Sequence, residues 1–440
     1  MMIKLILPGL VLLFSCYTNQ SYCKNDLNGN NSMNSVGKHG EISAKPFEPD
    51  DYKIITSDRA DGRYVSTRGF VQYLIRNQQP QLAFDPQFSK QEFLQWQKKV
   101  REKMQELMKF PDVTPQPLPK FLSSVKREGY RVEKWEFYPQ SGSVVPFLML
   151  IPDGVSAENP APVALCLPGS NRSKEQLAGE EELNPVFANS KFNDENKMAK
   201  FYAQEGIIAV AVDNPGIAET SDLEKYTGKI VYDRTTFTRY LIDMDWHYMG
   251  FSAFQSHQLL KWLRTLGFIN PERIVLSGHS LGTVAAMYLA VLNQDVYAVV
   301  YNQCITRLID YAKVRTRPDS IGRRPESSWL GHSVPGMWKW FDYPDILASL
   351  SPRPVIFSEG ATLSDIELIK RAYHIMGADA NLAVYHYPMY KDCRNRKHDY
   401  ETIPEGLDHK EFWEYYNIDG PNHYFKADVV VPWLKDVLKP

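Results

Sequence analysis

The sequence predicts an α/β fold in which a mostly parallel central sheet is covered by helices on both faces. From Val125 onward, short apolar runs alternate with segments of helical periodicity, which is typical of strands joined by crossover helices. The runs are almost continuously apolar, as expected for parallel strands buried on both faces. Turn-forming residues follow two of the runs, at Pro168-Gly169 and at Asp213-Asn214-Pro215-Gly216. Folds of this class bind ligands at that edge of the sheet.

The expected elements follow in chain order. Two paired edge strands are expected over residues 130–137 and 144–151, and further strands over 162–167, 207–212, 273–277, 296–301, 354–358 and 382–387. Helices are expected over about 193–204, 251–266, 281–292, 365–376 and 429–438. Three segments, about 214–250, 305–345 and 389–420, are longer than connections require. Long connections in compact domains are often lids or binding loops.

Residues 45–124 form an extension ahead of this domain, which spans residues 125–440. The extension has little strand pattern, but apolar side chains recur at helical spacing at Phe93, Trp96, Val100, Met104 and Leu107. They predict an amphipathic helix from about Lys90 to Lys109, which ends before Pro111. Because one face of this helix is apolar, we expect it to pack on the larger domain.

Composition narrows the functional classes. The 440 residues are 43% hydrophobic and 23% charged, which is ordinary for a globular protein. Fifty Lys and Arg stand against 52 Asp and Glu, a balance that argues against a general nucleic-acid binder. Five cysteines are too few for a disulfide scaffold. Cys166 and Cys304 lie in apolar runs and are interpreted as buried small residues, with a disulfide between them as the alternative.

The amino terminus has the pattern of a targeting segment. Residues 5–14 form an apolar run that is too short to span a bilayer but suits a secretory signal peptide, here residues 1–15. The end of the run, Leu13-Phe14-Ser15-Cys16, resembles a bacterial lipobox. That resemblance implies a lipid anchor on Cys16 and a periplasmic, outer-membrane or cell-surface lipoprotein. An ordinary signal peptide cut nearby is the alternative. Residues 25–43 are rich in Asn, Gly and Ser, and residues 16–44 are expected to form a flexible tether.

A candidate nucleophile lies between an expected strand and an expected helix, in Gly278-His279-Ser280-Leu281-Gly282. This G-x-S-x-G pattern presents a serine hydroxyl on a tight turn, where the flanking glycines leave room. Ser280 is therefore the expected nucleophile, with a helix-capping serine as the alternative. The backbone N–H of Leu281, at the start of the helix, is expected to face a developing oxyanion.

With this motif the chain resembles the α/β-hydrolase superfamily over residues 125–440. The resemblance implies a general base in the loop before the closing helix, which is the position of His423. The other candidates are His386, His398 and His409.

The resemblance also implies an acid after the strand at 354–358, commonly as Gly-x-x-Asp. Here Leu363 stands three residues after Gly360. Asp365 is the favoured acid and Glu359 the alternative, with Asp310 after the preceding strand as a third possibility.

The oxyanion loop is expected at Pro168-Gly169-Ser170-Asn171, where Ser170 or Asn171 would supply a second N–H. The turn Asp213-Asn214-Pro215-Gly216 resembles one that shapes the pocket in dienelactone-hydrolase-like and acetyl-xylan-esterase-like enzymes, although these residues also form simple turns. Aromatic residues gather in two of the long insertions and suit either stacking on sugar rings or lid packing. They are Trp338, Trp340, Phe341, Tyr343, Trp413, Tyr415 and Tyr416.

A narrower resemblance is to exported esterase-like proteins of the Bacteroides type, described as acetyl xylan esterases. It rests on residues 341–345, 351–354, 405–408 and 419–425 and on the helical extension. It implies a serine esterase acting through an acyl-enzyme on carbohydrate esters. We expect no metal or organic cofactor, since the sequence has no HExxH, zinc-spaced Cys–His or glycine-rich phosphate motif.

Two alternatives stay open. One is a serine peptidase of the prolyl-oligopeptidase kind, although the chain lacks a propeller-like repeat region. The other is a non-catalytic carbohydrate-binding protein on a hydrolase scaffold that has lost its activity. Leu363 at the usual position of the acid supports the second alternative.

Overall fold

The computed structural model describes residues 57, 59–170, 172–184, 196–224, 229–231, 233–302, 307–317, 330–385, 403–416, 418 and 420–439. The chain divides into residues 1–47 and a compact unit of residues 48–440, to which every described residue belongs. The expected signal peptide, lipid-anchored Cys16 and tether lie outside the described residues, as do Asn171, Cys304, His386 and His398. No helix among the described residues has both the length and the apolar character needed to cross a bilayer.

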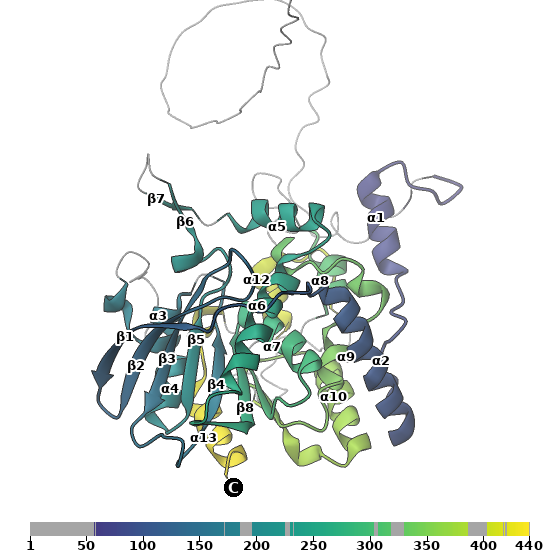
Figure 1. Cartoon of the computed structure of the whole chain (residues 1–440). Coiled ribbons are helices and arrows are strands. Elements are labelled where there is room, and N and C mark those ends of the chain that lie inside the picture. The colour runs from purple at the N-terminus through teal and green to yellow at the C-terminus, as the bar shows by residue number, and fades with distance from the viewer. Residues whose placement is uncertain are drawn as a thin grey trace, which may run out of the picture. The chain divides into compact units, whose positions relative to one another are not determined.

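A nine-stranded sheet forms the centre of the unit (Figure 1). Its strands, in spatial order, are β1 (Lys120–Arg127), β2 (Tyr130–Phe137), β3 (Val145–Pro152), β5 (Ile208–Val212), β4 (Ala161–Leu167), β8 (Ile269–His279), β9 (Ala298–Asn302), β10 (Val355–Phe357) and β11 (Leu382–Val384). The pairings β1–β2, β2–β3 and β3–β5 are antiparallel, and the others, from β5–β4 to β10–β11, are parallel. The sheet is therefore mostly parallel, as the sequence predicts.

The expected pair of edge strands needs one correction. β2 and β3 pair as predicted, but β1 lies outside β2 and forms the edge, while β3 pairs with β5. The sequence pattern missed β1 because its residues 120–124 are exposed and lack an apolar face. A short second sheet pairs β6 (Asp222–Glu224) with β7 (Lys229–Val231) in the insertion that follows β5.

Two apolar cores lie on opposite faces of the large sheet, because successive side chains of a strand point to opposite sides. Along β3, Phe147 and Met149 belong to the larger core, whereas Leu148 and Leu150 belong to the smaller. The larger core is covered by α2 (Lys90–Met108), α6 (Tyr248–Leu263), α7 (Leu281–Leu292), α9 (Tyr343–Ala348) and α10 (Leu363–Met376). The smaller is covered by α3 (Lys174–Ala178), α4 (Met198–Gln204) and α13 (Ala427–Val437).

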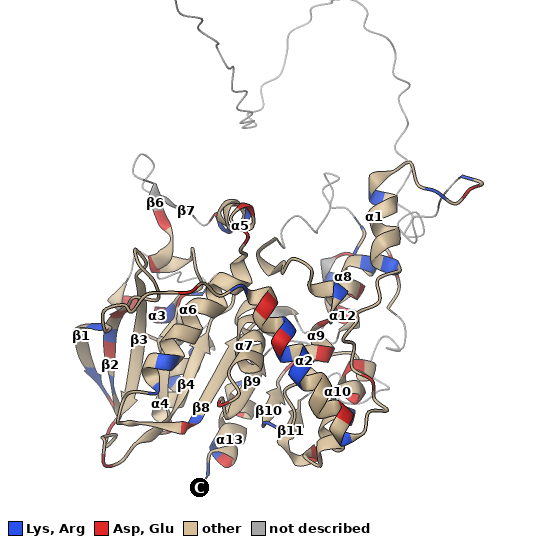
Figure 2. Ribbon diagram, turned by 45° about the vertical axis from the view of Figure 1, so that its right-hand side comes forward, with Lys and Arg blue, Asp and Glu red and all other residues tan. Residues whose placement is uncertain are grey.

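Helix α2, from the extension, is part of the larger core. A capping box of Ser89 and Glu92 starts it, and its apolar face packs on α6, α7 and α10. The Gln97 amide donates to the carbonyl oxygens of Ser349 and Ser351 at 2.7 and 2.6 Å. Figure 2 shows acidic and basic residues interspersed along α2, while the central strands carry almost none.

Among the described residues, the sequence did not predict several short helices of the insertions and the extension, which include α1 (Thr67–Arg76), α5 (Arg234–Asp243), α8 (Leu308–Val314) and α12 (His409–Tyr415). Figure 1 shows α5, α8 and α12 toward the end of the molecule opposite the carboxyl terminus. They lie beyond the edge of the sheet where the candidate site residues gather, so the long insertions frame that edge.

Candidate active site

Ser280 occupies a strained turn between β8, which ends at His279, and α7, which begins at Leu281. Its backbone has φ 51° and ψ −121°, a conformation that residues other than glycine rarely adopt. Strained backbone of this kind is often found at functional sites. The flanking glycines are required by close approaches. A Cβ on Gly278 would lie 2.5 Å from the backbone of Thr283, and one on Gly282 would lie 2.1 Å from the carbonyl oxygen of Leu167.

His423 is held by Glu359. Nδ1 of His423 lies 2.9 and 3.0 Å from the two carboxylate oxygens of Glu359. The Glu359 side chain is fully buried and that of His423 is 14% exposed. The other ring nitrogen, Nε2, is buried and has no hydrogen-bond partner among the described residues. A carboxylate on Nδ1 fixes the tautomer that leaves Nε2 able to accept a proton.

Asp365, the acid favoured by the sequence, does not contact this imidazole. Its carboxylate accepts a hydrogen bond from Nε of Arg307 at 2.7 Å, and burial raises its pKa. Asp310, on α8, lies within 4.0 Å of Arg307 and 3.6 Å of Lys313. The structure therefore brings Glu359, and not Asp365, to the imidazole of His423. Helix α10 begins at Leu363, so Asp365 already lies in its first turn.

Asn302, the last residue of β9, joins the segments that carry these groups. Its carbonyl oxygen accepts from the N–H of Ser280 at 3.2 Å. Its side-chain oxygen accepts from the Ser358 hydroxyl at 2.8 Å and from the N–H of Lys426 at 2.9 Å. Its amide nitrogen donates to the carbonyl of Tyr424 at 3.2 Å. Because Ser358 precedes Glu359 and Tyr424 follows His423, the backbone carbonyl and the side-chain amide of one buried residue together hold all three segments.

Two further rings enclose His423. The ring of His279 lies 4.8 Å from it, centroid to centroid, and that of Trp413, from α12, lies 5.1 Å away at an edge-on angle of 63°. His279 is only 3% exposed, and burial, followed by the nearby positive groups, holds its pKa well below its usual value. This lowered pKa favours the uncharged form of the His279 ring.

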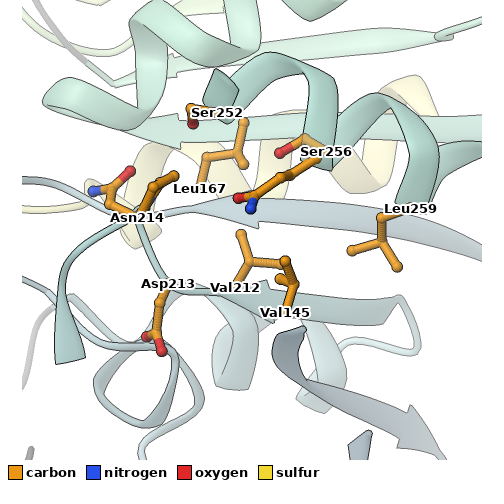
Figure 3. Close-up of a pocket in the computed structure, with 10 residues that line it drawn as sticks. Val145, Leu167, Val212, Asp213, Asn214, Ser252, Ser256 and Leu259 are labelled. Atoms are coloured by element: carbon orange, nitrogen blue, oxygen red, sulfur yellow. The ribbon is translucent and has the colours of Figure 1, made fainter. Parts of the chain in front are cut away.

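The loop after β4 approaches Ser280 through Gly169. A Cβ at Gly169 would lie 2.9 Å from Nδ1 of His279 and 3.4 Å from Cβ of Ser280. The side-chain amide of Asn214 donates to the carbonyls of Pro168 and Gly169 at 3.0 and 2.8 Å. Figure 3 shows Asn214 beside Leu167 at the end of β4, with its side chain directed away from that of Asp213. Ser170 follows in this loop and is partly buried.

A buried ionic cluster fixes the same loop to the strand beside it. Lys174 has no exposed side-chain surface, and its Nζ lies 2.9 Å from both Asp213 and Glu175 and 2.6 Å from Glu219. Burial opposes the charge on Lys174, but the surrounding carboxylates, Asp213 first, outweigh it and raise the lysine pKa. Removing a member of such a cluster leaves an uncompensated buried charge, which is strongly destabilising.

Residues 46–436 match the Abhydrolase family. The chain belongs to this family. It is 44% identical to a protein of Bacteroides fragilis NCTC 9343 whose crystal structure carries the provisional assignment of an acetyl xylan esterase. That match covers 89% of this chain and 100% of the other, with a TM-score of 0.83.

More distant structures also resemble this hydrolase. An acetyl xylan esterase from Paenibacillus sp. R4 is 14% identical with a TM-score of 0.43, over 72% of this chain and 93% of that one. A glucuronoyl esterase from Solibacter usitatus is 13% identical with a TM-score of 0.43. That match covers 64% of this chain and 81% of the other. No curated protein matches the chain.

The aromatic residues of the insertions have different surroundings in this hydrolase. Trp413 contacts His423, whereas Phe341, Tyr343 and Tyr416 are at most 3% exposed and pack inside the protein. His409, a rival for the base, begins α12. In the described part of the chain, no three His, Cys, Asp or Glu side chains are grouped as metal ligands.

The sequence pattern does not predict a role for Asn302. His279 occupies a variable position of the G-x-S-x-G motif, so the motif predicts no role for it either. A polar residue at the end of the strand after the nucleophile helix was the one available signal for Asn302.

Proposed function

We propose that this hydrolase is a serine esterase that removes acyl groups, acetyl above all, from saccharides through an acyl-enzyme. The observation that carries the proposal is the pairing of buried Glu359 with Nδ1 of His423, which leaves Nε2 without a partner among the described residues. Ser280 lies on the strained turn whose N–H is held by Asn302, the residue that also holds the histidine segment. The protein of 44% identity is assigned as an acetyl xylan esterase, which supports acetyl as the acyl group and a saccharide ester as the substrate.

The reaction begins when the Ser280 hydroxyl adds to the ester carbonyl and its proton passes to Nε2 of His423. The charge that develops on the imidazole is stabilised by Glu359, which lies 2.9 Å from Nδ1. The oxyanion accepts hydrogen bonds from the backbone N–H of Leu281, at the start of α7, and of Ser170. The imidazolium then protonates the departing sugar oxygen, which leaves as a free hydroxyl. Water repeats the sequence on the acyl-enzyme and releases the carboxylic acid.

The position of Glu359 favours catalysis over the alternative of a binding protein without activity. That alternative rested on Leu363 at the usual place of the acid. The acid function is available from Glu359, two residues after the end of β10. A carboxylate that only orients an imidazole tolerates such a shift along the chain.

We also propose export and lipid attachment at Cys16, on the strength of the apolar run and the lipobox-like sequence that ends it. Labelled fatty acid supplied to the producing bacterium is expected to enter the wild-type chain and not the Cys16→Ala variant. Equal labelling of both would contradict attachment at this cysteine.

Hydrolysis of p-nitrophenyl acetate tests the esterase proposal. The wild type is expected to show a burst of p-nitrophenol equal to the active-site concentration, followed by slower turnover, if deacylation is the slower step. Ser280→Ala is expected to lose activity by roughly 10⁴-fold or more. Ser124→Ala, on the exposed strand β1, serves as a matched control and should behave as wild type.

A fluorophosphonate probe provides a second readout, because it labels an activated serine irrespective of the leaving alcohol. The peptide that contains Ser280 should carry the label in mass spectra. Label on another serine, or retained turnover in Ser280→Ala, would overturn the mechanism.

A further inference from the structure

A cavity of about 400 Å³ lies between the turn after β5 and helix α5, within the size range of small-molecule sites. Three aromatic rings, two carboxylates, three aliphatic hydroxyls and the phenol of Tyr240 line it. The lining includes Thr220, Ser221, Asp222, Asp233, Phe237 and Tyr240. None of these residues belongs to the catalytic group described above.

The cavity begins where the oxyanion loop is held. Its wall includes Pro215 and Gly216, which directly follow Asn214 in the chain. Asn214 donates to the carbonyl of Gly169, and a Cβ on Gly169 would lie 3.4 Å from Cβ of Ser280. The cavity wall therefore adjoins the residue that holds the loop approaching Ser280.

The shape of the cavity is built into the backbone. Gly216 has φ +74°, and a Cβ there would lie 2.5 Å from the ring of Phe237. Only glycine allows the turn and the α5 ring to approach this closely. The Thr220 hydroxyl donates to the carbonyls of Asn214 and Ile217 at 3.1 and 2.8 Å, which holds the turn closed on itself. The wall is therefore preorganised, which reduces the cost of ordering it around a ligand.

The lining combines an exposed ring with carboxylate acceptors. Tyr240 is 53% exposed although it lies on a helix face next to the cavity. Asp222 and Asp233 are both exposed, and Asp233 accepts the N–H of Thr236 at the start of α5. Flat rings stack on the C–H faces of sugars, and carboxylates accept hydrogen bonds from their hydroxyls. Two carboxylates at one cavity also disfavour a ligand that carries its own negative charge.

We propose that this cavity is a subsite for neutral sugar residues of the substrate, and that it selects uncharged saccharide esters against uronic-acid-rich ones. The inference rests on the proposed esterase function, because it concerns the part of the same substrate that lies beyond the reacting ester. It adds a binding role for α5 and for the turn of residues 215–222, with Tyr240 as the stacking platform.

The first test compares two substrates in each protein. The quantity measured is the ratio of kcat/KM for an acetylated xylo-oligosaccharide to kcat/KM for p-nitrophenyl acetate, which has no sugar. Tyr240→Ala is expected to lower this ratio about fivefold to tenfold, the usual contribution of an aromatic contact. Tyr73→Ala is the matched control, since Tyr73 is 46% exposed on α1, a helix of the same ten-residue length. Its ratio should equal that of wild type. An unchanged ratio in Tyr240→Ala would overturn the subsite.

The second test measures binding without turnover. Ser280→Ala protein is titrated by calorimetry with neutral xylo-oligosaccharides and with oligogalacturonides of equal length. The neutral series should bind more tightly, and Asp222→Asn should reduce the difference. Tighter binding of the uronic acids would overturn the charge argument. A wild type that does not hydrolyse p-nitrophenyl acetate would refute the esterase function, whereas the titration would still decide whether the cavity holds a neutral sugar.

Discussion

Replacing Glu359 by Gln removes the charge that faces the imidazolium while it keeps the shape of the side chain. The carboxylate oxygens lie 2.9 and 3.0 Å from Nδ1 of His423, so the two charges are separated by about 4 Å. At an effective dielectric constant of about 20 their attraction is about 4 kcal/mol. Lys426, 3.6 Å from Glu359, offsets part of it. We therefore expect kcat to fall by about 10² to 10³-fold, since about 1.4 kcal/mol corresponds to tenfold.

The assay is the steady-state hydrolysis of p-nitrophenyl acetate, with the thermal unfolding temperature measured in parallel. Asp365→Asn is the matched comparison, because Asp365 is a buried carboxylate that pairs with Arg307 instead of the histidine. It should lower the unfolding temperature but leave kcat within about threefold of wild type. If Asp365→Asn loses more activity than Glu359→Gln, or if Glu359→Gln retains nearly full turnover, the assignment of the acid from geometry is wrong.

Three further outcomes are expected. Asn302→Ala leaves the groups that its amide holds without partners, so the free energy of unfolding should fall by about 3 kcal/mol in denaturant melts, with a lower kcat; a fully active, equally stable variant would contradict this. Gly169→Ala places a Cβ 2.9 Å from His279 and should lower kcat about 10- to 100-fold, with wild-type turnover as the contrary result. Burial lowers the pKa of His247, so the folded state binds its proton less tightly than the unfolded state. The stability that neutral His247 contributes is then lost as pH falls below 6.5. His247→Gln should show a smaller drop in unfolding temperature between pH 7 and pH 5 than wild type, and an equal drop would refute the linkage. Burial raises the pKa values of Asp342 and Asp345, which changes stability with pH in the opposite direction. Because both proteins contain these aspartates, their contribution is the same in each and cancels in the comparison.

The strands and helices of the core were predictable because burial leaves a clear pattern. Strand β2 and helix α7 have the bounds that periodicity predicts, Tyr130–Phe137 and Leu281–Leu292. Elements whose stability comes from local capping were missed. Helix α12 starts from a capping box of Asp408 and Glu411 within a polar stretch, and its seven residues are too few to show a periodicity.

The site residues divide in a similar way. The strained turn at Ser280 was predictable because its chemistry is encoded in adjacent residues. The sequence favoured Asp365 as the acid, whereas Glu359 contacts the histidine, because Thr362 starts α10 by accepting the N–H of Asp365 and so places Asp365 in the first turn of the helix. The role of Asn302 was not predicted, since its side-chain hydrogen bonds reach residues more than 50 positions away in the chain. No local pattern records such contacts.

The place of α2 inside the larger core means that the boundary between extension and catalytic domain exists only in the sequence. Its buried side chains, Phe93, Trp96, Val100, Met104, Leu107 and Met108, contribute on the order of 10 kcal/mol by burial alone, as much as the whole net stability of a typical domain. A chain trimmed to start at residue 111 would expose α6, α7 and α10 to water and lose its soluble state. Calorimetry of the intact protein should accordingly show the two regions melting in one transition.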